Sequence, residues 1–351
     1  MIDKNLLGYA INVGNKISNE YLAKGDYYPK EAWGCEGQIY PSLMGLMLLE
    51  LYKIEKNELY INAVKSIIAK NSEKQMPSGG WPLSLGVVAN GSKFEVSDHI
   101  KKITSVCEDL PSTATALRLN AEYQLLTGDK HFIESLERGI RYLIFFWNGD
   151  ESIFNEMMAG EALKLRANPK NYQIYAYQCV ESISKLYSDF SKFITPLYET
   201  IKNIFMDMNE NTYPLLYALY ASLIIEKEGP SDYVLTKVKK RIDNEITFGS
   251  KFIIPNVSGA MGHRDGLRGI CLSEGHLRNS VGAAIVMNFY DSYVEPKIYT
   301  NTKFYSDLTS WILKMYEEGR FYEFIDLETN TKVGFGTPGQ YIPLMWILNK
   351  I

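Results

Sequence analysis

Long apolar runs, basic clusters and paired cysteines are all missing from this sequence of 351 residues. No apolar stretch reaches the ~18 residues that a membrane-spanning helix needs, so we expect no membrane span. The N-terminus, Met1–Asn5, has no basic segment leading into an apolar one, which argues against a signal peptide. The formal net charge is only −4 and Lys and Arg form no run, so we expect no nucleic-acid partner.

The 4 cysteines are scattered and never form a CxxC pair, which argues against a structural zinc site. Few cysteines without a signal peptide are typical of a reducing compartment. We therefore expect reduced thiols and a cytoplasmic protein, and we predict neither a metal nor a cofactor.

Tyrosine, by contrast, is abundant, with 25 residues. Its ring is apolar and its tip is polar, which suits the wall of a wet cavity. The same property also suits the rim of a large core, so both interpretations stay open.

Six segments begin with small or polar residues and continue as helices that are apolar on nearly every side. They are 37–52, 109–123, 171–187, 211–225, 276–293 and 337–351. Several carry Pro in the first turn, or Ser, Thr, Asn or Asp near the cap, as helix starts do. Helices of this composition are buried all round.

Six amphipathic helices alternate with these segments, at 6–22, 58–70, 130–146, 190–206, 233–246 and 303–315. A hairpin of one amphipathic and one apolar helix cannot bury the apolar helix by itself. We therefore predict an all-α fold, a single (α/α)6 toroid whose inner ring of helices is surrounded by an outer ring. An open α-solenoid is the rival, but it would not need such apolar inner helices.

Four long segments each lead from an outer helix into an inner one, at 75–108, 147–169, 249–275 and 318–337. Long loops on a rigid scaffold are where functional residues concentrate. We expect all four at the N-terminal ends of the inner helices, on one functional rim. Because no Gly/Ser-rich linker divides the chain, we expect residues 1–351 to form one domain.

The segment Gln75–Trp81, QMPSGGW, resembles the QxxxGxW repeat of squalene and other terpene cyclases, and Pro111–Leu117 resembles the inner-helix start that follows it. The string Gly79–Pro82 is also similar to a segment of toroidal pectate lyases. The resemblance covers about Gln75–Leu119. It implies the α/α-toroid architecture that terpene cyclases and prenyltransferases share with toroidal glycosidases and polysaccharide lyases.

The cyclase motifs DxDD and DDxxD are absent. Where the resemblance would place the proton-donating aspartate, this chain reads Asp109-Leu110-Pro111-Ser112. Because these motifs are missing, an enzyme of the terpene cyclase or prenyltransferase type, acting on an isoprenoid, is only the alternative prediction.

The densest group of ionisable residues lies in 262–279, just before a predicted inner helix. His263 or His276 is expected to act as general acid or base. A helix N-terminus favours an anion, so nearby arginines are expected to bind a carboxylate, phosphate or sulfate. These are Arg264, Arg268 and Arg278. The alternative is a solvated loop whose charges pair with one another.

Carboxylates also precede the inner helices. Glycoside hydrolysis needs an acid paired with a base or nucleophile, and for a hydrolase we expect Glu36 with Asp109 or Glu274. Glu108 is expected to contact the substrate. Helix capping is the alternative explanation for Asp109.

Aromatic side chains near the same rim are expected to contact the substrate. They are Trp33, Tyr40, Trp81, Tyr172, Tyr213 and Tyr341. Aromatic faces stack on sugar rings and also stabilise carbocations, so they do not separate the two substrate classes.

The function predicted from these features is a carbohydrate-active enzyme, either a glycoside hydrolase or a uronate-type polysaccharide lyase or epimerase. Its substrate would be a small molecule or an oligosaccharide. In a lyase or epimerase, an arginine would neutralise the uronate carboxylate, while His263, His276 or a tyrosine would move the α-proton. A non-catalytic binding toroid is the remaining alternative.

Overall fold

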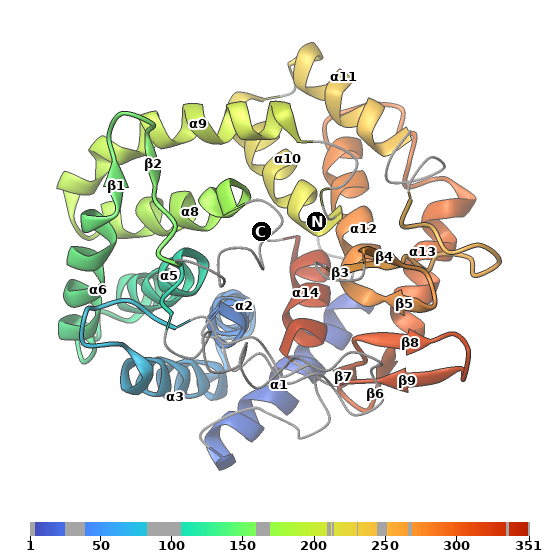
Figure 1. The fold of residues 1–351 in the computed structure, drawn as a ribbon. Coiled ribbons are helices and arrows are strands. Elements are labelled where there is room, and N and C mark those ends of the chain that lie inside the picture. Colours follow the sequence, from blue (N-terminus) through green and yellow to red (C-terminus); the bar gives the residue numbers. More distant parts are fainter. Residues whose placement is uncertain are drawn as a thin grey trace. The chain divides into compact units, whose positions relative to one another are not determined.

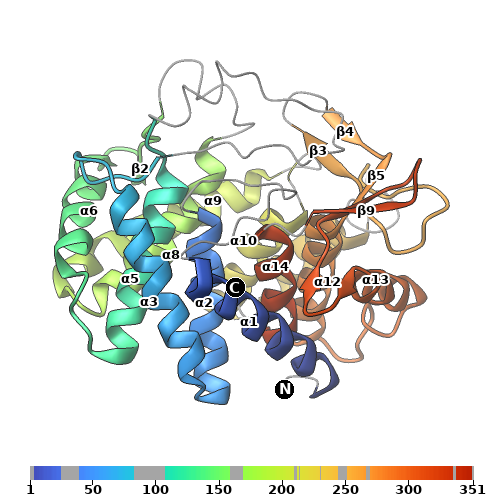
Figure 2. The ribbon, with the colours of Figure 1, turned by 90° about the horizontal axis from the view of Figure 1, so that it is seen from below.

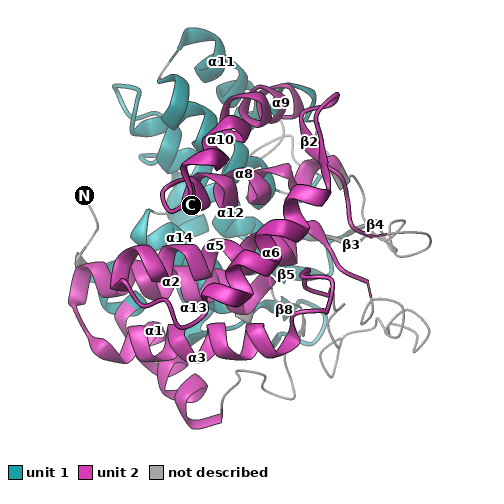
Figure 3. Cartoon of the chain, turned by 90° about the vertical axis from the view of Figure 1, so that its left-hand side faces the viewer, with its two compact units in different colours: residues 1–10, 205–351 teal, residues 11–204 magenta. Residues whose placement is uncertain are grey.

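The computed structural model describes residues 4–24, 39–82, 107–158, 169–208, 212, 214–229, 231–243, 251–265, 269–334 and 337–349. The contacts divide the chain into two compact units (Figure 3). One unit comprises residues 11–204, and the other comprises residues 1–10 together with 205–351. Helix α1 (Lys4–Lys24) begins in the second of these and continues in the first.

The unit of residues 11–204 is built around three neighbouring helices, α2 (Ile39–Glu55), α5 (Leu110–Thr127) and α8 (Gln173–Ser184). In Figure 1, α5 lies between the other two. The remaining elements of the unit are α3 (Glu58–Lys74), α6 (Ile133–Phe145), most of α9 (Ile194–Asp207), the 3-10 helices η1 (Pro169–Tyr172) and η2 (Ser188–Phe193), and the strands β1 (Trp147–Asn148) and β2 (Ile153–Phe154).

The difference between the central and the flanking helices follows from their residues. In α5, thirteen side chains from Leu110 to Gln124 are buried, and they include polar ones such as Thr113 and Asn120. In α6, the stripe of Leu136, Ile140 and Leu143 is buried while the opposite face is exposed. A helix that is apolar on one stripe packs against others on that stripe alone.

The segment QMPSGGW folds as a clasp between α3, α5 and α6. The Gln75 amide donates to the carbonyl oxygens of Gly79 (2.8 Å) and Ser135 (3.0 Å), and it accepts hydrogen bonds from Ser135 Oγ and Arg138. Trp81 is 2% exposed, and its indole N–H donates to the carbonyl oxygen of Asn71 at 2.8 Å. The motif therefore has a structural role in this chain.

The unit of residues 1–10 and 205–351 contains the helices α10 (Pro214–Glu228), α11 (Asp232–Arg241), α12 (Leu277–Asp291), α13 (Lys303–Lys314) and α14 (Thr337–Leu348). Its strands are β3 (His263–Asp265), β4 (Gly269–Cys271), β5 (Glu274–His276), β6 (Tyr316–Glu317), β7 (Arg320–Phe321), β8 (Phe324–Asp326) and β9 (Thr331–Val333). The sheets are β3-β4, β6-β7 and the three-stranded β5-β8-β9, all antiparallel. Figure 2 shows β3, β4, β5 and β9 at the same end of α12 and α14.

Both units use the same device to attach a hairpin to the helix that follows it. The side chain of Gln173 donates to the carbonyl oxygen of Phe154 (2.7 Å) and accepts from its N–H (3.0 Å). Gln340 makes the same pair of bonds to Phe321, at 2.7 and 2.9 Å. A buried glutamine in the first turn of the helix thus continues the hydrogen bonding of the strand.

The predicted helices are confirmed. All twelve α-helices of the described part of the chain coincide with a predicted segment, with ends that differ by a few residues. The long segments were predicted as loops, but the described parts of three of them contain short strands. Strands of two or three residues are too short to give an alternating pattern in the sequence.

Among the described residues, no helix is both long enough and apolar enough to cross a membrane. The cysteines within that part, Cys107, Cys179 and Cys271, are free thiols. That all 351 residues form one domain stays a prediction.

The close packing behind the clasp is testable at Gly139. A Cβ added there would come 2.6 Å from Leu117 Cδ2 and 2.8 Å from Trp81 Cζ3. We expect Gly139→Ala to lower the free energy of unfolding by about 1–3 kcal/mol, because the core has no room for the methyl group. Urea titration followed by circular dichroism measures the change.

Gly8→Ala is the matched control, because Gly8 is also helical and a Cβ there meets nothing within 4 Å. It should leave stability unchanged or raise it by up to about 1 kcal/mol. Equal stability of the two variants would contradict the packing described here.

Candidate functional site

Strand β5 places two ionisable side chains on one face of its sheet. Successive residues of a strand point to opposite faces, so Glu274 and His276 share a face and Gly275 lies on the other. A Cβ on Gly275 would come 3.0 Å from Trp311 Cζ2 and 3.4 Å from Ala260 Cβ. Because Gly275 has no side chain, the strand packs closely against Trp311 and Ala260 on this face. Glu274 and His276 lie on the opposite face.

Glu274 and His276 form a buried hydrogen-bonded pair. His276 Nε2 lies 3.0 Å from Glu274 Oε2, and each side chain is 7% exposed. The imidazole also stacks on Phe324, with ring centroids 5.0 Å apart and planes 12° from parallel. Phe324 stands directly opposite His276 in the β5–β8 pair, so the register of the sheet orients the ring.

The backbone around His276 is held from several directions. Its N–H donates to the carbonyl oxygen of Met261 at 2.7 Å, and its carbonyl oxygen accepts from Ser280 Oγ at 3.2 Å. One turn into α12, Asn279 is fully buried and donates from Nδ2 to the carbonyl oxygen of Gly262 at 2.7 Å. His276 is therefore fixed at the N-cap of α12.

Glu323 is a second buried acid at this helix start, and the sequence did not point to it. It is 7% exposed and lies between β7 and β8, and its carbonyl oxygen accepts the N–H of Leu277 at 2.9 Å. A Cβ on Gly334 would come 3.3 Å from Glu323 Oε2, so the carboxylate lies against that glycine. The segment carries no motif that singles it out.

A carboxylate against an imidazole can hold and move a proton. The carboxylate only accepts, so the bond to Nε2 favours the tautomer in which Nε2 carries hydrogen, and it stabilises the imidazolium after a proton is taken up. Burial strengthens this electrostatic coupling because few waters screen it.

Asp109 and Glu108 lie together in the unit of residues 11–204. Asp109 is 1% exposed and caps α5 by accepting the N–H of Ser112 at 2.9 Å. Glu108 accepts hydrogen bonds from Tyr142 OH at 2.8 Å and from Ser78 Oγ. Burial and the hydrogen bond to Glu108 raise the pKa of Tyr142.

Glu156 joins Asp109 at the start of α5. Its Oε1 accepts the N–H groups of Leu110 and Met157, each at 3.1 Å. Burial raises the pKa of the Glu156 carboxyl above its ordinary value, although hydrogen bonds from backbone N–H groups act in the opposite direction. Two carboxyl groups thus satisfy N–H groups at one helix start.

The predicted aromatic contacts lie in different surroundings. Tyr172 is half-buried at the start of α8, and its ring lies parallel to that of Tyr175, with centroids 6.3 Å apart. Tyr40 is half-buried in α2, whereas Trp81 and Tyr341 are 2% and 4% exposed. Contact of any of these rings with a substrate stays a prediction.

Several predicted residues fall outside what the structure describes. Glu36, Trp33, Tyr213 and Arg268 lie outside the described residues. His263 and Arg264 lie in β3, but their side chains are not among those described. Arg278 is half-buried in α12. The hydrolase pairing of Glu36 with Asp109 or Glu274 stays a prediction, as do the anion-binding roles of the arginines.

Within the part of the chain that the structure describes, no three His, Cys, Asp or Glu side chains are arranged to hold a metal ion.

The chain matches no family model and no curated protein at significance. Solved structures do resemble it. A D-mannose isomerase aligns with a TM-score of 0.68 at 12% identity, over 99% of this chain and 98% of the other. Cellobiose 2-epimerase from Spirochaeta thermophila aligns with a TM-score of 0.65 at 10% identity, over 98% and 97%.

Two further likenesses belong to other reaction classes. Unsaturated glucuronyl hydrolase from Bacillus sp. GL1 aligns with a TM-score of 0.59 at 10% identity, over 98% of this chain and 95% of the other. The type II terpene cyclase MstE from Scytonema aligns with a TM-score of 0.53 at 11% identity, over 98% of each chain. These structures are α/α toroids, which establishes the predicted fold class. At such identities the likeness establishes the fold alone.

The effect of the burial of Glu156 on stability can be tested by measuring the melting temperature at different pH values. A carboxyl whose pKa rises on folding destabilises the protein only where it must ionise. This destabilisation is absent at low pH, where the carboxyl is protonated, and it grows as the pH rises through the raised pKa. Glutamine keeps an acceptor oxygen without the charge, so we expect Glu156→Gln to have a higher melting temperature than wild type at about pH 8, and an equal one at about pH 3.

Glu134→Gln, an exposed position in α6, is the matched control and should show no such trend. A constant difference between Glu156→Gln and wild type across this pH range would refute the effect of burial.

Proposed function

We propose that this chain is an enzyme that acts on a sugar, and that His276, paired with Glu274, transfers a proton in its reaction. The observation that carries the proposal is the buried pair itself, 3.0 Å between Nε2 and Oε2, stacked on Phe324 at the start of α12. Buried ionisable side chains that are hydrogen-bonded to each other are found at many functional sites.

The reaction class that fits best is proton transfer at the carbon next to a sugar carbonyl, as in an isomerase or epimerase. With Nε2–H donating to Glu274, Nδ1 of His276 takes the proton from that carbon. The electrons of the C–H bond move to form an enediolate, whose negative charge rests on the former carbonyl oxygen. The imidazolium then returns its proton. In an isomerase the proton goes to the neighbouring carbon while the hydroxyl proton of the enediolate moves to the former carbonyl oxygen. In an epimerase it goes to the other face of the same carbon after the enediolate has turned over in the site.

Glu274 has two roles in this scheme. It selects the tautomer that leaves Nδ1 as the base, and its negative charge stabilises the imidazolium that forms. Arg278, two residues along α12, is the arginine we expect to stabilise the enediolate oxygen or a substrate carboxylate.

The comparisons support this class over its rivals. D-mannose isomerase and cellobiose 2-epimerase, at TM-scores of 0.68 and 0.65, are enzymes whose names describe sugar rearrangement. The cyclase-like motif is accounted for by the clasp around Gln75 and Trp81, so it gives no separate support to an isoprenoid substrate. Asp109 already caps α5, which weakens its case as a hydrolytic acid.

Hydrogen exchange in deuterated water tests the proposal. The purified protein is incubated in D₂O with D-mannose, D-glucose, D-fructose or cellobiose, and NMR follows the carbon-bound hydrogen next to the carbonyl position. We expect wild type to replace this hydrogen of at least one sugar by deuterium. We expect His276→Gln to slow that exchange by about 10²–10⁴-fold, because it removes the base.

Glu274→Gln should slow the exchange less than His276→Gln, since the base remains while its supporting charge is lost. His131→Gln, at an exposed histidine beside α6, is the matched control and should exchange at the wild-type rate. The proposal fails if wild type exchanges none of the four sugars, or if His276→Gln exchanges as fast as wild type.

A further inference from the structure

The two units of the chain repeat one arrangement of hydrogen bonds at the start of a buried helix. At α5, the N–H of Asp109 donates to the carbonyl oxygen of Trp81 at 3.1 Å, and the N–H of Trp81 donates to Thr113 Oγ1 at 3.0 Å. At α12 the same two bonds, at 2.7 and 3.1 Å, are made by His276, Met261 and Ser280. His276 is therefore the counterpart of Asp109.

The spacing along the chain is the same for each pair of counterparts in the two helices that follow. It separates Asp109 from His276, and equally the two buried glutamines that bond to a strand, Gln173 from Gln340. It also separates Glu156 from Glu323. The two helix starts are copies of one repeat and can be compared position by position.

The copy at α5 satisfies its own first turn. The carboxylate of Asp109 accepts the N–H of Ser112 at 2.9 Å, and the carboxyl group of Glu156 accepts the N–H of Leu110 at 3.1 Å. Acidic groups also suit the positive end of the helix dipole. Nothing at this helix start calls for a ligand.

The copy at α12 is capped differently. The counterpart of Asp109 is His276, whose side chain makes no capping bond. The counterpart of Glu156 is Glu323, which accepts the N–H of Leu277 through its carbonyl oxygen and not through its carboxylate. The side-chain acceptor that α5 provides for its third N–H is therefore missing at α12, where that N–H belongs to Asn279. A helix start of this kind favours an anionic oxygen.

The side chain of Asn279 is a second, independent indication of a ligand. It is fully buried, and its Nδ2 donates to the carbonyl oxygen of Gly262 at 2.7 Å. Only the amide nitrogen can donate, so this bond fixes the orientation of the amide, with Oδ1 turned away from Gly262. Oδ1 has no hydrogen-bond partner among the described residues. Buried acceptors without a partner are rare.

The Asn279 amide lies at the N-terminal end of α12. Helical side chains tilt toward the start of their helix. Gly262, to which the amide is bonded, directly follows Met261, whose carbonyl oxygen accepts the N–H of His276. The unused Oδ1 and the third N–H of the helix therefore lie beside the histidine that we propose as the base.

We propose that the first turn of α12 binds the reacting end of the sugar. The N–H of Asn279 donates to the oxygen that carries the negative charge of the enediolate, and Asn279 Oδ1 accepts a hydrogen bond from the hydroxyl group on the neighbouring carbon. An aldose or ketose presents these two groups on adjacent carbons. The inference rests on the proposed function for its ligand, and it assigns the subsite that holds the substrate against His276.

Ligand-observed NMR titration tests the subsite, with D-mannose and D-arabinonohydroxamate as the probes. The hydroxamate group has the planar shape and the two adjacent oxygens of the enediolate. We expect wild type to bind it at least tenfold more tightly than D-mannose. Asn279→Asp places a negative charge where the anionic oxygen would bind, so it should raise the Kd of the hydroxamate about 100-fold.

Asn279→Ser introduces the residue that stands at the same position of the other copy, Ser112, so the helix start is expected to accept it. It removes the amide, and we expect it to raise the Kd of both probes about tenfold, the effect of one good hydrogen bond. Circular dichroism and melting temperature establish that each variant is folded.

Asn120→Ser is the matched control. Asn120 is a buried asparagine of α5, 4% exposed, whose amide also donates to a carbonyl oxygen, that of Phe132 at 3.2 Å. The variant loses the same kind of bond, and it should bind both probes like wild type.

If Asn279→Asp does not fold, Asn279→Ser decides alone. An unchanged Kd of both probes in folded Asn279→Ser overturns the subsite and leaves Oδ1 to a buried water. Failure of wild type to bind either probe, or binding of the hydroxamate no tighter than that of D-mannose, also overturns it.

The subsite and the proposed reaction fail separately. Sugar exchange by wild type together with unchanged binding by Asn279→Ser would remove the subsite alone. Weaker binding by Asn279→Ser together with no exchange by wild type would remove the proposed reaction alone.

Discussion

A helix buried on every side must have its first N–H groups satisfied by the protein, because water does not reach them. This constraint governs the structure wherever an apolar helix begins. At α5, the carboxyl groups of Asp109 and Glu156 accept these N–H groups. At α12, the carbonyl oxygen of Glu323 accepts the N–H of Leu277. Polar and ionisable residues are thereby drawn into places of low dielectric.

The candidate chemistry is a consequence of that placement. A carboxylate and a histidine at an exposed loop would be screened by water and would interact weakly. Glu274 and His276 instead lie in a strand that ends at the helix start, with Trp311 packed on the opposite face at Gly275 and Phe324 stacked on the imidazole. The pair is therefore both oriented and largely shielded, which is what proton transfer to carbon requires.

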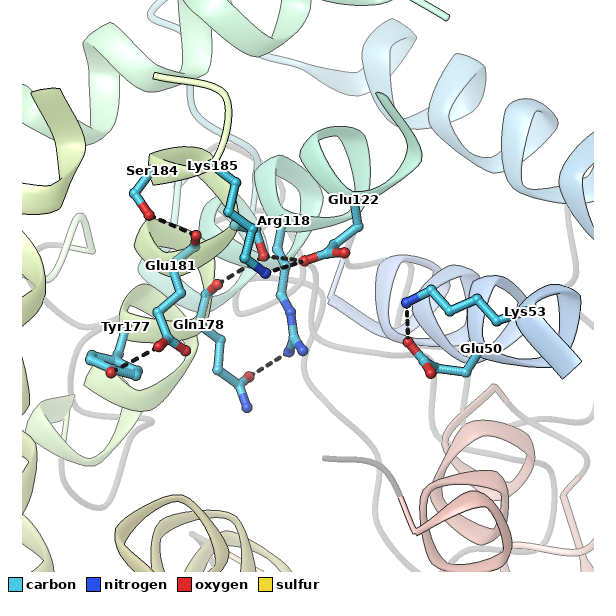
Figure 4. A network of polar contacts seen from close by, with 10 residues as sticks. Glu50, Lys53, Arg118, Glu122, Tyr177, Gln178, Glu181, Ser184 and Lys185 are labelled. Carbon is cyan, nitrogen blue, oxygen red and sulfur yellow. Dashed lines mark hydrogen bonds and ion pairs between the residues drawn. The ribbon is translucent and has the colours of Figure 1, made fainter. Parts of the chain in front are cut away.

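The polar network that joins α2, α5 and α8 has a different origin (Figure 4); it comprises Glu50, Lys53, Arg118, Glu122, Gln178, Glu181 and Lys185. Lys53 lies in the last turn of α2 and Lys185 at the C-cap of α8, where basic side chains interact favourably with the helix dipole. Its acidic and basic members pair with one another, and the side chains of Lys53 and Lys185 are exposed to solvent.

The sequence by itself determined the helices and the fold class. The contrast between helices apolar all round, such as α5, and helices apolar on one stripe, such as α6, is a local property of composition and spacing. The cap at Asp109 was also readable, because the residue type and the following proline are local signals. The segment 262–279 was recognisable as rich in ionisable residues, but its geometry was not.

Only the tertiary structure decided which of those residues meet. Glu274 and His276 are two positions apart, a spacing that puts side chains on one face in a strand but not in a helix or an irregular loop. That strand exists because β5 pairs with β8, some fifty residues further along the chain. Glu323, Glu156 and Gln178 likewise owe their surroundings to segments distant in sequence, and no local pattern encodes such contacts.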